Sequence, residues 1–208
     1  MRAKMMGDEM PDVIGAYIEL LEEMPFSRIL VKELVAKSGI PRSTFYLNYG
    51  GTLEVLEQIE QHLLEELTLY PNEGKGVDMP FDCMRAWFEA CIENHRAINA
   101  ITGENGDPYF TKRLMNRLVR QMSLMMKDDR LTPGQMLDYV CDAMASMCVG
   151  LILHISQDAA NNCEVDPMAL AGMVNLIRVA YHNDVASTPS ISSERLYGES
   201  AGSELWKH

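Results

Sequence analysis

Residues 39–49 read Gly-Ile-Pro-Arg-Ser-Thr-Phe-Tyr-Leu-Asn-Tyr, and they join a helix-breaking turn to a short helix that mixes one cation, hydroxyl groups and aromatic rings. Apolar residues recur at helical spacing just before, in residues 31–38, so the segment is predicted to fold as helix, turn and helix. Pro41 suits the first turn of the second helix, where its missing N–H costs no hydrogen bond. Phe45 and Tyr49 lie four residues apart and are predicted to face the core. The second helix has the make-up of one that enters a DNA groove.

The outer face of this second helix supplies the groups predicted to touch DNA. A guanidinium and three hydroxyl groups within residues 42–46 can serve both phosphate oxygens and base edges. Phosphate contacts would fix the register of the protein on the duplex, whereas base contacts would read the sequence. The predicted DNA-binding residues are Lys32, Arg42, Ser43, Thr44, Tyr46, Asn48 and Thr52.

At these residues the sequence resembles the TetR family of one-component bacterial repressors. Residues 13–21 are similar to the first helix of that family, residues 29–35 to its second, residues 42–49 to its recognition helix and residues 53–60 to the start of its connecting helix. Residues 103–110 are similar to a segment in the ligand domains of one branch. The resemblance implies an all-α fold, with a three-helix helix-turn-helix domain followed by a helical ligand-binding and dimerisation domain. It also implies a homodimer on palindromic double-stranded DNA, released by a small-molecule effector.

Two positions depart from the family pattern. Leu30 stands where the family usually has a Thr that opens the second helix, and Thr52 stands where it has a Lys that opens the connecting helix. Leu30 can neither cap a helix nor donate to a phosphate, so Ser27 is predicted to be the cap. Asn48 replaces a common His and carries no charge at any pH. We therefore expect a weaker affinity for phosphate than is usual in the family.

Composition favours helices and a cytoplasmic location. The chain has 208 residues, 47% of them hydrophobic and only 7% aromatic, with 16 Met and few alternating runs. It contains no uninterrupted run of about 18 apolar residues, and residues 1–12 lack the apolar core of a signal peptide. No membrane partner is therefore expected. Five Cys without regular spacing fit reduced thiols better than a disulfide framework.

The net charge of −12 is distributed unevenly along the chain. Residues 1–50 carry six cations and seven acids, so the remaining 158 residues carry −11 of the total. Residues 27–52 hold four cations and one acid, which gives +3. The pattern predicts an acidic body with a modestly basic part that contacts DNA. Repulsion between the body and DNA would disfavour non-specific binding and leave a salt-sensitive specific mode.

Breaks in the helical pattern predict three regions: a DNA-binding domain in residues 1–52, a connecting helix and effector-binding body in residues 53–183, and a flexible tail in residues 184–208. The first break inside the body is Pro-rich and Gly-rich, at residues 71–76. The expected body helices cover about residues 53–70, 82–100, 108–127, 134–157 and 167–182.

The last two of these helices are the predicted dimer surface, because each carries an apolar stripe. An intramolecular core would produce the same pattern, and periodicity does not separate the two readings. The resemblance favours the dimer, in which two helices from each subunit form a four-helix bundle. The residues of the two stripes are Met136, Val140, Met144, Met147, Leu151 and His154, followed by Ala169, Met173, Leu176, Ile177 and Ala180.

Methionine, cysteine and aromatic side chains in the body could line a cavity for an apolar effector, because Met adapts its shape to varied apolar ligands. For any single one of them, a place in the packed core is the simpler alternative. The candidates are Met84, Trp87, Phe88, Cys91, Met122, Met125, Met126, Met144 and Met147.

Metal and catalytic sites have weaker support. Cys91 and His95 would share a helix face, but no two Cys have the close spacing of structural zinc sites, so no metal and no cofactor is expected. Acidic pairs such as Asp138 with Asp142 are usual on a solvated helix face. Because phosphate-binding, nucleophile-elbow and dinucleotide motifs are absent from the sequence, we do not expect an enzyme. The alternative to a DNA-binding regulator is a helical ligand- or protein-binding module with little DNA affinity.

Overall fold

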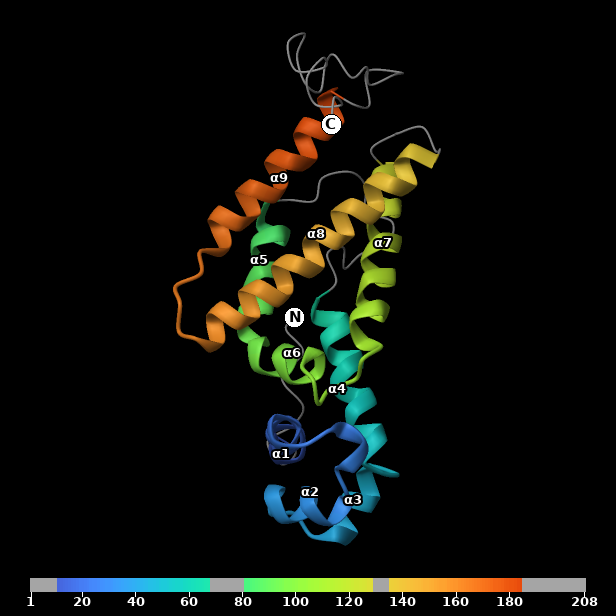
Figure 1. Cartoon of the computed structure of the whole chain (residues 1–208), viewed down its shortest axis with the longest axis vertical. Helices are drawn as coiled ribbons and strands as arrows, with labels where there is room; N and C mark the ends of the chain where they lie inside the picture. Colours follow the sequence, from blue (N-terminus) through green and yellow to red (C-terminus); the bar gives the residue numbers. More distant parts are fainter. Residues whose placement is uncertain (1–10, 68–80, 129–134, 185–208) are drawn as a thin grey trace, which may run out of the picture.

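The structure, a computed structural model, describes residues 11–67, 81–128 and 135–184, and every regular element in these ranges is a helix, as predicted (Figure 1). Side chains near the edges of the ranges, among them those of Met125, Met126 and Met136, lie outside the described part, as does the predicted tail from residue 185 on. The helices are α1 (Pro11–Glu23), α2 (Val31–Ser38), α3 (Arg42–Asn48), α4 (Thr52–Glu66), α5 (Phe81–Glu93), α6 (His95–Thr102), α7 (Phe110–Asp128), α8 (Gln135–Ala160) and α9 (Pro167–Asp184), with a 3-10 turn, η1, at Phe26–Arg28.

Helices α1, α2 and α3 form a small N-terminal unit, which we call the head. The turn between α2 and α3 begins at Gly39, whose backbone is left-handed with φ 74° and whose N–H donates to the Val35 carbonyl. Glycine adopts this conformation without steric cost. Phe45 and Tyr49 are buried, and their rings stack with centroids 5.3 Å apart. The predicted helix, turn and helix are therefore confirmed, and α3 is anchored through one face.

The start of α2 differs from the predicted capping. Leu30 is the N-cap, and its own N–H donates to the Glu33 carboxylate at 3.0 Å. Ser27 lies earlier, within η1, and is exposed. The prediction that Ser27 caps α2 is therefore wrong, because the 3-10 turn places it three residues before the cap position. The Glu33 bond satisfies the backbone N–H of the cap residue, which is one half of a capping box, and the apolar Leu30 side chain cannot accept an N–H in return.

Helix α4 runs from the head into the remaining helices, α5 to α9, which we call the body (Figure 1). Its inner face is apolar and continuous, with Val55, Leu56, Ile59 and Leu63 all buried. At its end, the Trp87 indole N–H donates to the Leu67 carbonyl at 3.0 Å. The predicted division at residue 52 falls at the first residue of α4, but the domain boundaries themselves stay predictions.

The body contains one helix more than expected, because residues 82–100 form two helices and not one. The chain breaks at Asn94, whose side-chain amide donates to the Ala90 carbonyl at 2.9 Å, while the His95 imidazole Nδ1 lies 2.8 Å from the Ile92 carbonyl. Side chains that bond to nearby backbone carbonyls compete with regular helical geometry. The break turns α6 across the end of the body nearest the head (Figure 1).

Helix α8 is the central helix of the body and packs against α5, α6 and α7. Its stretch Asp138–Ala160 is, among the described residues, long and apolar enough to cross a membrane by length and composition alone. Core helices of soluble proteins pass the same test. The predicted absence of a membrane partner therefore stays a prediction.

Candidate nucleic-acid interface

The exposed face of α3 is organised around Arg42 and Tyr46. An Arg42 guanidinium N–H donates to the Tyr46 hydroxyl at 3.2 Å, and the guanidinium carbon lies 5.5 Å from the centre of the Tyr46 ring. The Tyr46 ring itself meets the buried Phe45 ring edge to face, with centroids 5.4 Å apart. A guanidinium has five N–H donors in a fixed plane, so Arg42 keeps donors for another acceptor while the ring restricts its position.

The other residues predicted to contact DNA differ in their exposure and in the hydrogen-bonding groups they have left. Ser43 is exposed, whereas Thr44 is half-buried. The Asn48 amide donates one hydrogen to the Thr44 carbonyl at 2.9 Å, which leaves its second hydrogen and its oxygen. Thr52 is half-buried as the first residue of α4. The contact of each with DNA stays a prediction.

Leu47 was missed by the sequence reasoning. Its side chain is 84% exposed, although leucine in a short amphipathic helix would ordinarily be assigned to the core. The signal was available in the phase of the helix, because Leu47 follows the buried Phe45 by two residues and therefore lies on the opposite side. An apolar side chain at this position can contact the methyl group of a thymine.

The positive charge of the head is partly neutralised within the head itself. The Lys37 ammonium lies 2.6 Å from the Glu23 carboxylate and 3.4 Å from that of Glu19, both on α1. Hydrogen bonding to Glu23, and then to Glu19, raises the pKa of Lys37, which stays charged. Lys32, by contrast, is exposed on α2. The charge of Lys37 is therefore much less available to phosphate than a count of cations suggests.

The head is joined to the body where α1 meets α6. Two guanidinium nitrogens of Arg96 donate to the Glu22 carboxylate at 2.8 and 3.1 Å, and Arg96 also lies 3.7 Å from Glu19. The hydrogen bond to Arg96 lowers the pKa of Glu22. Farther along, the Phe26 N–H donates to the Asn105 carbonyl at 2.8 Å. We call this junction of α1 with α6 and the following loop the seam.

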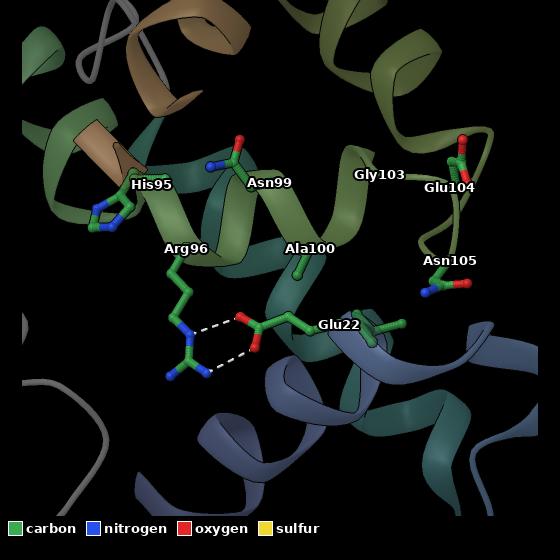
Figure 2. A pocket seen from close by; sticks show the side chains of 10 residues that line it. Glu22, His95, Arg96, Asn99, Ala100, Gly103, Glu104 and Asn105 are labelled. Carbon is green, nitrogen blue, oxygen red and sulfur yellow. Dashed lines mark hydrogen bonds and ion pairs between the residues drawn. The ribbon is translucent and has the colours of Figure 1, made fainter. Parts of the chain in front are cut away.

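A cavity of about 460 Å³ lies in the seam (Figure 2). Figure 2 shows the Arg96–Glu22 pair on one side and Glu104 and Asn105 on the other, with Ala100 between them. The cavity is therefore bounded by the head, by α6 and by the loop that follows α6. Its lining residues are Leu21, Glu22, His95, Arg96, Asn99, Ala100, Gly103, Glu104, Asn105 and Ala160.

The loop on the far side of this cavity has a fixed shape. A Cβ on Gly106 would lie 1.9 Å from the Ile101 carbonyl oxygen, so only glycine fits there. The Gly106 N–H donates to the Gly103 carbonyl at 3.1 Å. The Asp107 carboxylate then accepts the Tyr109 N–H at 2.9 Å, just before α7 begins at Phe110. Glu104 and Asn105 are consequently held in place by the residues on both sides.

A partly buried charge cluster ties α4 to α7 and to the loop that precedes α7. One Arg113 nitrogen lies 2.6 Å from the Glu60 carboxylate and 2.7 Å from that of Asp107. Glu60 is 8% exposed, and its second oxygen is buried without a hydrogen-bond partner in the described part of the chain. Burial raises the pKa of Glu60 to about 7, against the attraction of Arg113 and with the help of the Asp107 charge. Burial, with a smaller effect of Glu60, also raises the pKa of the nearby Tyr17.

None of the residues predicted to bind an apolar effector lines either of the two described cavities. Six of these residues are buried in the core of the body and Met147 is half-buried, while the side chains of Met125 and Met126 lie outside the described part. The second described cavity, of about 380 Å³ between α7 and α8, contains none of them. Core packing accounts for their burial, and a role in effector binding stays a prediction. The buried residues are Met84, Trp87, Phe88, Cys91, Met122 and Met144.

Cys91, Cys141 and Cys148 of the body are buried thiols, whereas Cys163 is exposed. Burial raises the pKa of Cys91 well above its usual range, with a smaller effect of Cys148, and raises that of Cys148 to about 12. Both are therefore protonated at neutral pH, and a protonated thiol is a poor metal ligand. Across the described residues, no group of three His, Cys, Asp or Glu side chains is arranged to hold a metal ion.

The predicted dimer surface is only partly exposed. On α9, Met173 and Leu176 are 42% and 69% exposed, and Ala169 is exposed beside them. On α8, His154 is exposed but Met144 is only 7% exposed, so the prediction of Met144 on the outer stripe is wrong. Met144 turns inward because it belongs to the face of α8 that packs in the body. The remaining described stripe residues, Val140, Met147 and Leu151, are half-buried, and the side chains of Ile177 and Ala180 lie outside the described part.

No protein-family model matches this chain, and no curated protein matches it. Among solved structures, the dihydroxyacetone kinase operon activator DhaS matches with a TM-score of 0.59 and 14% identity, covering 85% of this chain and 97% of that one. The fatty acid degradation regulator FadR from Bacillus halodurans matches with a TM-score of 0.54 and 11% identity, covering 84% of this chain and 96% of that one. At such identities the likeness shows a shared fold alone.

Proposed function

We propose that this chain is a cytoplasmic, DNA-binding transcriptional regulator, a repressor that a small-molecule effector releases from its operator. The observation that carries the proposal is the exposed pair of Arg42 and Tyr46 on a short helix whose opposite face is anchored by Phe45 and Tyr49. A guanidinium held in this way can reach the edge of a guanine or a phosphate in the major groove. The likeness in fold to proteins described as regulators adds support. The proposal includes no catalytic step.

The proposed regulator acts as a homodimer on palindromic double-stranded DNA. One subunit leaves Met173 and Leu176 exposed on α9, while the outer side of α8 presents small residues at Ala143, Ser146 and Gly150. Exposed apolar side chains on α9 and exposed small residues on α8 each favour close packing against helices of a second subunit. Two heads related by a two-fold axis would then read half-sites about 34 Å apart.

A helical binding module with little DNA affinity is the second candidate. It is favoured by the pairing of Lys37 with Glu23 and Glu19, which reduces the charge that the head offers to phosphate. Leu30, which is 50% exposed at the start of α2, has no donor for phosphate either. Under this proposal the body would bind its ligand, and ligand binding would not change the affinity of the chain for DNA.

A mobility-shift experiment separates the two candidates. The full chain is titrated onto the DNA upstream of its own coding sequence, in about 50 and 200 mM salt, with an unrelated duplex of the same length as competitor. A regulator should bind the upstream DNA specifically and should lose affinity at the higher salt. Arg42→Ala should weaken this binding, whereas Lys112→Ala, which removes an exposed cation from the body, should not. Equal binding to both duplexes, or none, would favour the binding module.

A further inference from the structure

The cavity in the seam is the one described cavity that touches both the head and the body. Leu21 and Glu22 come from α1, whereas the α6 residues and the loop through Asn105 belong to the body. The cavity volume of about 460 Å³ lies within the range of sites that bind small molecules. A molecule held there would contact both units at once.

Two carboxylates and one guanidinium are among the side chains that line the cavity. Glu22 and Glu104 contribute carboxylates. The His95 Nδ1 faces the Ile92 carbonyl at 2.8 Å, and since a carbonyl only accepts, Nδ1 carries a proton there. The Asn99 amide is committed, because it donates to the Ser156 carbonyl and accepts from the Ser156 hydroxyl, both at 2.9 Å. Asn99 therefore contributes to the shape of the cavity more than to hydrogen bonding with a ligand. The carboxylates of Glu22 and Glu104 favour a ligand that donates hydrogen bonds.

The cavity also has a negative charge and an apolar surface. Its one guanidinium, Arg96, is paired with Glu22 through two hydrogen bonds, so the Glu104 charge is not balanced by another lining residue. Leu21 and Ala100, both buried, supply apolar surface that suits a short alkyl chain. A phosphate or carboxylate would meet like charge here, and a purely apolar molecule would leave the carboxylates without partners.

We propose that the seam cavity is a binding site for a small alkyl diamine, with one ammonium group at Glu22, the other at Glu104 on the opposite side, and the alkyl chain between them against Leu21 and Ala100. A cation beside Glu22 competes with Arg96 for the same carboxylate. Ligand binding therefore weakens the ion pair that joins α6 to α1 and favours a different position of the head. The effect on DNA rests on the proposed function, whereas the binding itself does not.

Three probes of equal length test the chemistry of the site: 1,5-diaminopentane, 1,5-pentanediol and glutarate, which are dicationic, neutral and dianionic. Binding to the full chain is measured by calorimetry at constant ionic strength without DNA. The diamine should bind, and the diol and the dianion should bind at least about tenfold more weakly, because they lack the charge-assisted hydrogen bonds. Equal binding of diamine and diol would overturn the proposal, as would the absence of any diamine binding at 10 mM, a concentration about tenfold above a millimolar Kd.

Variants locate the site and separate it from the general attraction of an acidic protein for cations. Glu104→Gln should weaken diamine binding about tenfold, whereas Glu57→Gln, which removes the same charge from an exposed position on α4, should leave it unchanged. Arg96→Gln should tighten binding, because it removes the competing cation from Glu22, and Arg85→Gln on α5 is its matched control. Equal effects within either pair of variants would overturn the assignment.

The calorimetric experiment tests ligand binding independently of the proposed regulation of DNA binding. If the diamine binds with this variant pattern but the chain does not bind DNA, the cavity is a ligand site and the regulator proposal fails. If the chain binds DNA specifically but the diamine pattern is absent, the regulator proposal stands and the amine site fails. Circular dichroism of each variant checks that the helical content is unchanged.

Discussion

Glu60 of α4 and Arg113 of α7 are joined by an ion pair of 2.6 Å, yet the other oxygen of the Glu60 carboxylate is buried without a hydrogen-bond partner in the described part of the chain. Asp107 shares the same arginine nitrogen at 2.7 Å. One guanidinium therefore faces two carboxylates, and the more buried of them lies on the helix that carries the head. An arrangement of this kind is sensitive to protonation, because a proton on Glu60 removes a buried charge.

Stability should depend on pH through Glu60. Its pKa is raised in the folded state to about 7 from the ordinary 4.5, so the folded chain binds the proton more tightly than the unfolded chain. This contribution is fully present below about pH 4.5 and is lost as the pH rises through 7. Glu60→Gln has no proton to lose at this position. As the pH rises from 5 to 8, the free energy of unfolding of the wild type should therefore fall relative to that of Glu60→Gln by about 1–3 kcal/mol. Urea unfolding followed by circular dichroism at both pH values measures the difference.

Glu57→Gln is the control for that experiment, since Glu57 is exposed on the same helix. Its free energy of unfolding should follow that of the wild type at both pH values. A Glu60→Gln variant whose difference from the wild type does not change with pH would show that Glu60 titrates in the same range in the folded and unfolded chains.

Removing Arg113 should destabilise the fold. Arg113→Gln leaves Glu60 buried beside Asp107 without a cation, and because the Arg113 side chain is 41% exposed we expect a loss of roughly 1–3 kcal/mol at pH 7.5. The double variant Glu60→Gln with Arg113→Gln should recover part of that loss, since the more buried of the two unpaired charges, that of Glu60, is removed and only Asp107 lacks its cation. A double-mutant cycle in urea measures the coupling. Strictly additive losses would count against the cluster as a unit.

A cation at the start of α4 should strengthen DNA binding. Thr52 is half-buried at the first position of α4, and Thr52→Lys places an ammonium where the resembled family contacts phosphate. Specific affinity should rise, and the slope of log affinity against log salt should steepen by about one phosphate contact. Gln61→Lys, which adds the same charge at an exposed position farther along α4, is the control. An equal gain from both variants would mean a change in overall charge and no local phosphate contact.

Dimer formation should depend on the exposed stripe of α9. Sedimentation at micromolar concentration should report about twice the chain mass of 23.4 kDa. Leu176→Glu should give monomers that keep their helical content, because this side chain is 69% exposed in one subunit and its charge would be buried only at the interface. Leu47→Glu makes the same change at an exposed position of α3 and should leave the dimer intact. Loss of helical content in Leu176→Glu would place the residue in the core instead.

Helical periodicity predicted the helices of the head and the anchored face of α3, but it did not predict the contacts and the cavity of the seam. The spacing of Phe45 and Tyr49 identified the anchored face of α3, because one side of one helix is a local property. The cavity in the seam, in contrast, is assembled from α1, α6, the loop that follows α6, and the end of α8, at residues 21–22, 95–105 and 160. Periodicity shows that a helix has an apolar side, but it does not show which distant helix lies against it.

Some of the wrong or missed features have a local cause, and others depend on how distant helices pack. At Asn94 the side-chain amide donates to the Ala90 carbonyl and competes with helix continuation, whereas Ser27 lies in η1, a turn closed by backbone hydrogen bonds from Arg28 and Ile29. Met144 was assigned to the outer side of α8, where a helix with apolar residues on several sides leaves its orientation open. The ion pairs between Lys37 and the carboxylates of α1 could not be predicted from the sequence, since they depend on how α1 and α2 pack together.

The hydrogen bond from the Phe26 N–H to the Asn105 carbonyl uses main-chain atoms only. Any residue except proline at position 26 keeps the donor, and any residue at position 105 keeps the acceptor. The attachment of the head to the body at this point therefore survives mutation of the side chains around it. The side chains that line the neighbouring cavity can therefore change over evolutionary time without breaking this connection, except at Gly103, where a Cβ would lie 2.8 Å from the Asn99 carbonyl oxygen.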